Sequence, residues 1–515
     1  MTTRLRYAVM FMVGLVQQSG PSCNSKPKRA SAIADVQSLS EGYLEKVVAS
    51  LKGRGLIRSV KGPGGGYALN VPPERITLDM LLESVGDKVK MVRCDGGHEV
   101  CLSSGTERCN SHRLWHNMEK YVMHYLSNTS ILDVCNDTFE MLDSESDFIY
   151  ADHNATSEVS ASVRHKVANA LLFDNFYNPS SMHKWGQGSR KIVEDARAVV
   201  IEALNAQGYD VIFTSSGTEA NNLVFSTHKC RHIISAIEHP SVINAAVNPL
   251  VIPVNQDGVV SVDKLVEILE SLCGSKALLS VMLANNETGV IQPVERLLSE
   301  AKKYGVITHV DAVQACGKIP LNVSELGADF VTISSHKIGG ISGSGALLHR
   351  KGIDVSPMML GGSQERGLRA GTENVPAIYS LSIALKEIEK RVAGMQSIRG
   401  VRDFLESELK NRVPACTIVG EGAARLPNTT CVIMPGVSAE TQLIALDKAG
   451  IAVGIGSACS SGKISKSHVL SAMGIDAVDA RSAIRISFGT TATIEQAARI
   501  ARCWHEIYEN FCNLC

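Results

Sequence analysis

The sequence predicts an α/β fold with a mainly parallel sheet for the part of the chain after residue 148, preceded by a smaller module of helices and a hairpin. From residue 150 onward, short apolar runs alternate with amphipathic stretches of helical period, a pattern typical of strands joined by crossover helices. A chain of 515 residues is also too long for one hydrophobic core. An Asp-, Ser- and Glu-rich stretch, DSESD (143–147), separates the modules, so we expect domains at 1–145 and 148–515.

The composition is that of a globular chain and predicts no membrane partner. Apolar residues make up 44% and charged residues 20%, with a formal net charge of −1. No apolar run approaches the roughly 18 residues of a spanning helix, and YAVMFMVGLV (7–16) fits a first amphipathic helix better than a secretory signal. Fourteen cysteines without such a signal indicate a reducing compartment, so we expect a cytoplasmic protein.

The amino-terminal module follows a winged helix-turn-helix pattern. Helical periodicity runs through 4–18, 31–37 and 39–56, and IRSVKGPGGGYALN (57–70) predicts two short strands around a Gly-rich tip. In this pattern the second helix enters a major groove of double-stranded DNA. Residues 1–80 carry eleven Lys or Arg against five Asp or Glu. That excess fits a polyanionic partner, and an ordinary solvated basic face is the alternative.

A cysteine cluster follows this pattern and suits a metal centre. Its spacing is C-x6-C-x7-C-x2-H, formed by Cys94, Cys101, Cys109 and His112. Three thiolates and an imidazole suit zinc or an iron–sulfur cluster. The absence of a tight C-x2-C pair from this set favours iron–sulfur, and His98 and His116 are alternative nitrogen ligands. Unrelated surface thiols are the other interpretation.

The amino-terminal module resembles the IscR-type family of iron–sulfur-sensing transcription regulators. The resemblance rests on RYAV (6–9), the stretch 42–69 with its GPGGGY wing, and the Cys/His set. It implies a homodimeric winged-helix DNA binder that carries a 2Fe–2S cluster. By position, the implied ligands are Cys94, Cys101, Cys109 and His112.

The carboxy-terminal module predicts strands whose ends would form a ligand site. An amphipathic helix is expected over 189–205. The predicted strands cover 211–215, 232–237, 251–254, 277–283, 306–310, 330–334 and 345–350. In a parallel α/β sheet, ligands bind at the carboxyl ends of the strands, so polar residues that follow these runs are the site candidates.

Lys337 and Asp311 are the most informative of these candidates. Asp311 ends the strand-like run VITHVD (306–311), and Lys337 follows the run 330–334 in SSHKIGG. A lysine amine can form a Schiff base with the aldehyde of pyridoxal phosphate. A carboxylate can pair with the protonated pyridine nitrogen and keep the ring an electron sink. The two residues therefore predict a pyridoxal phosphate enzyme that acts on an amino acid.

Other polar residues at the strand ends complete the predicted site. Gly217 allows close backbone approach, and Thr218 with the following amides could hold a phosphate at a helix N-terminus. His239 could stack on the ring and carry protons. The remaining candidates are Asn286 for the phenolate or a substrate carboxylate, Gln314 for the phenolate, Ser334 and His336 for phosphate, and Arg485 as a carboxylate fork.

Cys459 is the candidate nucleophile. It lies in the Gly- and Ser-rich stretch GIGSACSSG (454–462), with no metal-ligand partner nearby. An exposed thiol is costly for solubility, so its expected role is thiolate attack on a substrate atom. An incidental loop cysteine is the alternative.

These motifs together resemble the NifS/IscS-type cysteine desulfurases. The matching stretches include YADHNAT (150–156), YNPSSMHKWG (177–186), ERGLRAGTEN (365–374), GSACSSG and IRISFG. The resemblance implies the PLP-dependent transferase fold type I, with a large domain at about 165–405 and a small α+β domain at about 150–164 plus 406–515. It also implies a homodimer in which Thr372 reaches the cofactor phosphate of the other subunit.

The same resemblance implies an activity. L-Cysteine would become L-alanine, and its sulfur would pass to Cys459 as a persulfide and then to an iron–sulfur scaffold protein. Lys337 would be the Schiff-base lysine, with Asn286 and Arg485 on the substrate carboxylate. Two alternatives stay open: a protein that acts primarily as a DNA-binding iron–sulfur sensor, and a related PLP enzyme such as a selenocysteine lyase or an aminotransferase.

Overall fold

The computed structural model describes residues 3–20, 26–37, 41–62, 65–90, 110–136, 148–174, 176–456 and 466–512. The chain divides into two compact units, Met1–Ser146 and Asp147–Cys515, called unit 1 and unit 2 below. Among the helices of the described residues, none is both long and apolar enough to cross a membrane.

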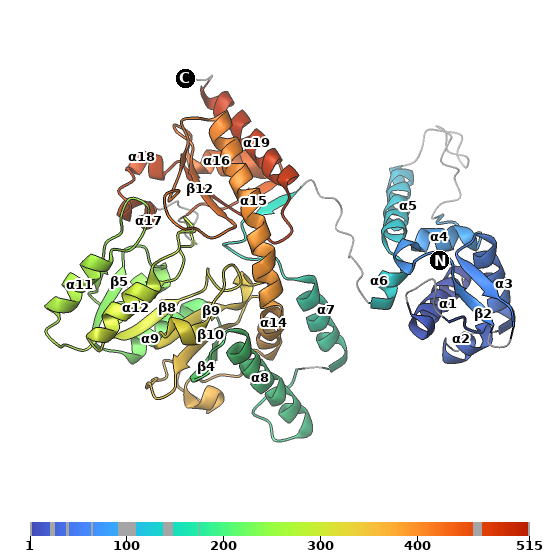
Figure 1. The fold of residues 1–515 in the computed structure, drawn as a ribbon, viewed down its shortest axis with the longest axis horizontal. Coiled ribbons are helices and arrows are strands. Elements are labelled where there is room, and N and C mark those ends of the chain that lie inside the picture. Colours follow the sequence, from blue (N-terminus) through green and yellow to red (C-terminus); the bar gives the residue numbers. More distant parts are fainter. Residues whose placement is uncertain are drawn as a thin grey trace. The chain divides into compact units, whose positions relative to one another are not determined.

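Unit 1 is built from helices and a two-stranded hairpin (Figure 1). The strands pair antiparallel from Ile57 opposite Leu69 to Val60 opposite Gly66. The elements are α1 (Thr3–Ser19), α2 (Ala30–Gln37), α3 (Glu41–Gly53), β1 (Ile57–Val60), β2 (Gly66–Leu69), a 3-10 turn (Pro73–Arg75), α4 (Leu78–Ser84), α5 (Asn110–Asn128) and α6 (Ile131–Asn136). The helices and the hairpin predicted from periodicity are therefore present.

The core of unit 1 holds the hairpin against the helices. Phe11 and Leu15 of α1 are fully buried in the same cluster as Leu44 and Leu51 of α3. These positions recur at helical spacing, so each helix turns one apolar stripe inward. At the hairpin, a side chain on Gly66 would clash with the backbone of Lys28, which explains a glycine at the first position of β2.

The main sheet of unit 2 has seven strands in the order β4-β10-β9-β8-β7-β5-β6. Strand β10 runs antiparallel to both of its neighbours, and the other pairs are parallel. The strands are β4 (Tyr209–Thr214), β5 (Arg231–Ser235), β6 (Leu250–Ile252), β7 (Ala277–Met282), β8 (Ile307–Asp311), β9 (Phe330–Ser334) and β10 (Gly345–Arg350). The mainly parallel sheet that the sequence predicts is therefore present, with its antiparallel pairs confined to β10.

Helices cover both faces of this sheet. Leu223 and Val224 of α9 pack on one face with Leu278 and Phe330, and the other face packs against α8, α12 and α14. The helices of unit 2 up to residue 386 are α7 (Ala161–Asn169), with a π turn at Ala170–Asp174, α8 (Lys184–Ala203), α9 (Gly217–Thr227), α10 (Pro240–Ile243), α11 (Val262–Ser271), α12 (Val294–Lys303), α13 (Val323–Leu326) and α14 (Val375–Lys386). Helix α8 begins five residues before its predicted start, because the His183 side chain caps the Gly186 N–H at 3.2 Å.

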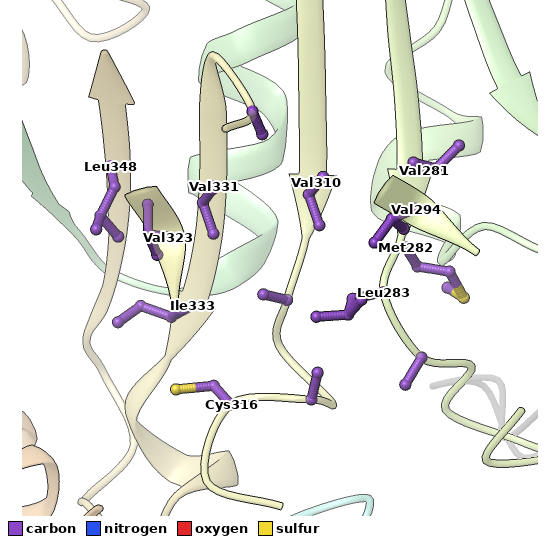
Figure 2. Close-up of a cluster of buried hydrophobic side chains, with 14 of the residues drawn as sticks. Val281, Met282, Leu283, Val294, Val310, Cys316, Val323, Val331, Ile333 and Leu348 are labelled. Carbon is purple, nitrogen blue, oxygen red and sulfur yellow. The ribbon is translucent and has the colours of Figure 1, made fainter. Parts of the chain in front are cut away.

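Burial on both faces explains why the strands read as continuous apolar runs. Figure 2 shows Val281, Val310, Val331 and Leu348 side by side on adjacent strands. Every residue of β7 and β9 is buried. A parallel sheet that is covered on both sides has this pattern, whereas a half-exposed strand alternates.

A second group of strands and helices in unit 2 has its own hydrophobic core and contains residues from both the beginning and the end of that unit. Strand β3, which follows residue 148, pairs parallel with β13. The elements are β3 (Ile149–Ala151), α15 (Ile388–Arg412), β11 (Thr417–Ile418), β12 (Thr429–Ile433), α16 (Ala439–Lys448), β13 (Ile451–Val453), α17 (His468–Ala472), α18 (Ala477–Ala480), β14 (Ala483–Ser487) and α19 (Ile494–Cys512). Trp504 of α19 and Leu405 of α15 are fully buried in its core.

Candidate active site

A cavity of about 450 Å³ lies at the carboxyl ends of the parallel strands of unit 2. It is lined by ten of the residues that the sequence singles out: Gly217, Thr218, His239, Asn286, Asp311, Gln314, Ser334, His336, Lys337 and Arg485. Its other walls include Gly456 and Lys466. A larger groove of about 840 Å³, lined mainly by aliphatic side chains near Pro320 and Val392, contains none of these ten residues.

Most of the other predicted site residues lie outside the part of the chain that the structure describes. Cys459 lies outside the described residues, although Gly456 and Lys466, on either side of it, line the cavity wall. Thr372 is exposed on the segment before α14. Cys94, Cys101 and Cys109 also lie outside the described residues, and the His112 backbone belongs to α5, whose side chain at this position is not described.

Lys337 sits in the 3-10 turn Ser335–Lys337 directly after β9. Its Nζ donates hydrogen bonds to the backbone oxygens of Asn154 and Ala155, each at 2.7 Å. Burial lowers the pKa of Lys337 from 10.5 to about 8, and the Arg485 charge acts in the same direction. An amine with this pKa is deprotonated in part near neutral pH, which a nucleophile or a base requires.

Asp311 ends β8 and is held by a chain of polar side chains. Its Oδ2 accepts a hydrogen bond from Asn221 Nδ2 at 2.8 Å, and its Oδ1 accepts from the Val313 N–H at 3.0 Å. Asn221 also donates to Ser241 Oγ at 2.9 Å, and Ser241 Oγ lies 2.7 Å from His239 Nδ1. The carboxylate and the imidazole are therefore fixed by one connected network.

His239 caps the short helix α10, where its Nδ1 accepts from the Ser241 N–H at 3.1 Å. Burial lowers its pKa, and Lys337 and His468 add to that effect while Asp311 opposes it. A neutral imidazole against the cavity can stack on a flat ring and exchange a proton.

The start of α9 forms one wall of the cavity. Ser216 caps this helix by accepting from the Glu219 N–H at 3.2 Å, and Thr218 follows on the first turn. A Cβ on Gly217 would lie 3.0 Å from Val313 Cγ2, so glycine permits the close packing of helix and sheet. Backbone N–H groups at a helix N-terminus favour a phosphate.

Arg485 projects from β14 into the cavity with part of its fork already occupied. Its Nη2 lies 2.5 Å from Asp152 Oδ1, and its Nη1 donates to the backbone oxygen of Asn286 at 3.0 Å. Its buried Nε makes no hydrogen bond within the described structure. The guanidinium therefore reaches the cavity, and a bound carboxylate would compete with Asp152 for it.

The sequence reasoning missed several residues of this site, among them Asn154, Lys318 and Glu287. Asn154 and Lys318 belong to the hydrogen-bond network below Lys337. Glu287 lines the cavity next to Gly456, and its Oε2 accepts from Ser467 Oγ at 2.6 Å. Burial raises the pKa of Glu287. Asn154 lies inside YADHNAT (150–156), one of the stretches that carry the family resemblance, and Glu287 directly follows the predicted site residue Asn286. These positions were the available indication.

Family models match both parts of the chain. Residues 149–500 match the family described as aminotransferase class-V. Residues 1–137 match the Rrf2 family, described as an iron-dependent transcriptional regulator. The expected fusion of a regulator module with a desulfurase-like module is thereby confirmed, and so is the winged-helix assignment of the amino-terminal part.

Individual relatives agree with the aminotransferase class-V match. A cysteine desulfurase of Nostoc sp. is 40% identical over 376 residues, which covers 70% of this chain and 93% of that protein. A protein of Bacillus subtilis named putative cysteine desulfurase IscS 1 is 38% identical over 370 residues and covered to 97%.

Two solved structures of NifS-like proteins have a fold similar to that of this chain. A NifS-like protein of Rickettsia africae is 39% identical with a TM-score of 0.64, and the match covers 70% of this chain and 99% of that one. A second NifS-like protein is 33% identical with the same TM-score and is covered completely. The predicted fold class, α/β of the NifS-like type, is confirmed. The chain belongs to the aminotransferase class-V family, with a segment that matches the Rrf2 regulators at its amino-terminal end.

Proposed function

We propose that unit 2 is a pyridoxal phosphate-dependent cysteine desulfurase that converts L-cysteine to L-alanine and receives the sulfur on Cys459. One observation carries the proposal. The amine of Lys337, the carboxylate of Asp311 and the guanidinium of Arg485 line one cavity together with Gly456 and Lys466, which flank the segment that contains Cys459. The names of the relatives support the same reaction.

The residues of the cavity fit pyridoxal phosphate. Asp311 would face the pyridine nitrogen, Lys337 would hold the aldehyde carbon, and the start of α9 with Thr218, Ser334 and His336 would hold the phosphate. Burial lowers the pKa of His336 to about 4, so this ring is neutral and can donate one N–H. When bound, the cofactor supplies an electron sink for the bonds that break at the substrate.

The protein groups would then handle the substrate and its proton. Arg485 and Asn286 would bind the substrate carboxylate once Asp152 releases part of the guanidinium. The Lys337 amine, with a pKa of about 8, would take the α-proton. His239 would carry a proton at the other side of the ring, since its lowered pKa keeps the imidazole able to accept one.

The sulfur step is a transfer between two thiols. The Cys459 thiolate attacks the sulfur of the substrate, the new S–S bond forms, and the Cβ–S bond breaks. The electron pair of the broken bond stays with the carbon fragment, which takes up two protons, from solvent and protein groups, and leaves as L-alanine. The substrate carbon is reduced, and the sulfur becomes the sulfane sulfur of a persulfide. An iron–sulfur scaffold protein would accept it.

Three variants of the full chain test this proposal. Cys459→Ala should retain the visible absorption of bound cofactor and lose sulfide release in the presence of dithiothreitol. Lys337→Ala should lose that absorption band. Cys273→Ala is the matched control, because Cys273 is an exposed free thiol away from the cavity lining, and it should behave as wild type. Full sulfide release by Cys459→Ala would contradict the assignment.

The same variant distinguishes a cysteine desulfurase from a selenocysteine lyase. A cysteine desulfurase needs the Cys459 thiol to take the sulfur of L-cysteine. If Cys459→Ala kept full activity on L-selenocysteine and the wild type did not turn over L-cysteine, the enzyme would be a selenocysteine lyase instead.

We propose that the dimer completes the cavity. Thr372 is exposed and lies outside the cavity lining of its own chain, as expected of a residue that contacts a second copy. Thr372→Ala should weaken cofactor binding by about tenfold, the loss of one hydrogen bond to a charged group. An unchanged dissociation constant would remove Thr372 from the site.

We propose that unit 1 binds double-stranded DNA and carries a 2Fe–2S cluster on Cys94, Cys101, Cys109 and His112. Exposed Lys46, Lys52 and Arg54 lie on and just after α3, and exposed Lys61 lies in the turn of the hairpin. Lysine contacts with phosphate weaken steeply with salt. Gel shifts of cluster-loaded and cluster-free protein at two salt concentrations test the proposal. DNA binding that ignores both the cluster and the salt would count against it.

A further inference from the structure

We infer that Lys318 is a positioning residue of the active site: its buried amine fixes the amide side chains of Asn154 and Gln314, which line the cavity beside Lys337. The inference rests on the proposed cofactor site and goes beyond it, because Lys318 itself does not line the cavity. It acts through the two amides.

The position of Lys318 is unusual for a lysine. It is fully buried with 0% of its surface exposed, and it lies four residues after Gln314 in a run of turns. Its Nζ donates to Asn154 Oδ1 at 2.6 Å and to Gln314 Oε1 at 2.6 Å. In the described structure, both hydrogen bonds therefore end on neutral amide oxygens, and burial of an amine without a counter-ion is costly.

The surroundings favour the neutral amine. Burial lowers the pKa of Lys318 well below 10.5, and the positive charges of Lys337, Arg391 and Arg485 lower it further. A neutral amine has two N–H donors, which matches the two amide oxygens that Lys318 contacts. Lys318 thus serves as a paired hydrogen-bond donor, and a structural ion pair does not account for its burial.

Lys318 fixes which end of the Gln314 amide faces Lys337. An amide can present either its oxygen or its NH₂ group to a neighbour, depending on a rotation of about 180°. Because Lys318 donates to the Gln314 oxygen, the Gln314 Nε2 points the other way and donates to the Asn154 backbone oxygen at 3.0 Å. That oxygen also accepts from Lys337 Nζ at 2.7 Å. Gln314 therefore presents its NH₂ group on the side of Lys337. The anionic ring oxygen of pyridoxal phosphate would need a hydrogen-bond donor of this kind.

The consequence for Asn154 links the same amine to the substrate side. With its Oδ1 on Lys318, the Asn154 Nδ2 donates to Thr429 Oγ1 at 3.0 Å and to the backbone oxygen of Asn286 at 3.3 Å. This backbone oxygen also accepts from Arg485. Lys318 therefore orients the side-chain amides of both Asn154 and Gln314, and Asn428 Nδ2 adds a longer contact of 3.4 Å to the same Asn154 oxygen.

The test compares Lys318→Met with wild type in the full chain. Two quantities are measured: the dissociation constant of pyridoxal phosphate, by equilibrium dialysis, and the pH midpoint at which the visible band of the bound cofactor changes. Without Lys318, the Gln314 amide is free to turn its oxygen toward the ring oxygen. We expect about tenfold weaker binding and a midpoint higher by roughly half a unit or more, since the lost donor stabilises the anionic oxygen.

Two further variants make the result specific. Arg402→Met removes another buried cation, which donates to the Leu426 backbone oxygen and is not among the described lining residues of the cavity. It should lower stability without moving the midpoint. In a Gln314→Met background, Lys318→Met should leave the midpoint where Gln314→Met sets it. If Lys318→Met is recovered unfolded, Lys318→Gln takes its place, because its amide nitrogen ends short of both oxygens.

The outcomes separate this inference from the proposed function. Wild-type dissociation constant and midpoint in a folded Lys318 variant would overturn the inference, and so would changes no larger than those of Arg402→Met. A wild-type chain that does not bind pyridoxal phosphate at all would overturn the proposed function instead.

Discussion

Loss of the Arg197 guanidinium should destabilise unit 2 strongly, because it leaves a buried carboxylate without its cation. Arg197 of α8 binds Glu365 through two parallel hydrogen bonds of 3.0 Å each. Their side chains are only 7% and 2% exposed. Glu365 also accepts from the Phe213 N–H at 2.9 Å and holds a left-handed φ of 45°. This pair thus ties the segment that leads to Thr372 onto β4 and α8.

The magnitude follows from burial. Removing one partner of a buried ion pair costs about 3 to 5 kcal/mol. Unfolding entropy is about 2.1 cal/mol/K per residue, so unit 2 has roughly 0.8 kcal/mol/K and a loss of about 4 kcal/mol lowers its Tm by about 5 °C. The double variant Arg197→Met with Glu365→Gln should lose clearly less, since it leaves no unpaired charge.

Calorimetry of the full chain measures these shifts. Lys191→Met is the matched control on the same helix, because the Lys191–Asp195 pair is 75% and 66% exposed and such pairs contribute about 0–1 kcal/mol. The reasoning is refuted if Arg197→Met melts within about 1 °C of that control.

The remaining predictions concern the cavity. In cofactor-free protein, Lys337 titrates at about 8 against 10.5 when unfolded, so the unfolded state binds more protons between these values. Lys337 should add at most about 3 kcal/mol to the free energy of unfolding through this window, and Lys337→Met should show a correspondingly smaller rise in pH-dependent urea titrations, since the lowered pKa of Lys318 remains. Equal slopes for variant and wild type would contradict the lowered pKa of Lys337. Gly456→Ala would place a methyl group against the Glu287 carboxylate and displace its Ser467 hydrogen bond, so we expect a loss of about 1–2 kcal/mol and slower sulfide release. Gly400→Ala, with open space around it, is the control, and equal behaviour of the two variants would rule out the contact.

The sequence by itself determined the class of the fold and most of the catalytic lining. Apolar runs such as 277–283 and 330–334 predict buried strands because a parallel sheet covered on both faces needs apolar residues at every position. Polar residues directly after these runs then predict the site, since strand ends meet at one edge of the sheet. Asp311 and Lys337 were found in this way, and the cavity lining contains both.

Only the tertiary structure decided which residues from distant parts of the chain share the site, and which hydrogen bonds and pKa values they have there. Lys318 reads as an ordinary polar lysine until the fold buries it against Asn154, 164 positions earlier in the chain. From the sequence, the Arg485 guanidinium is expected to be available to a ligand, but in the structure Asp152 binds one of its nitrogens. Hydrogen-bond partners and pKa values depend on burial and on charges brought together by packing, and no local pattern of residues contains that information.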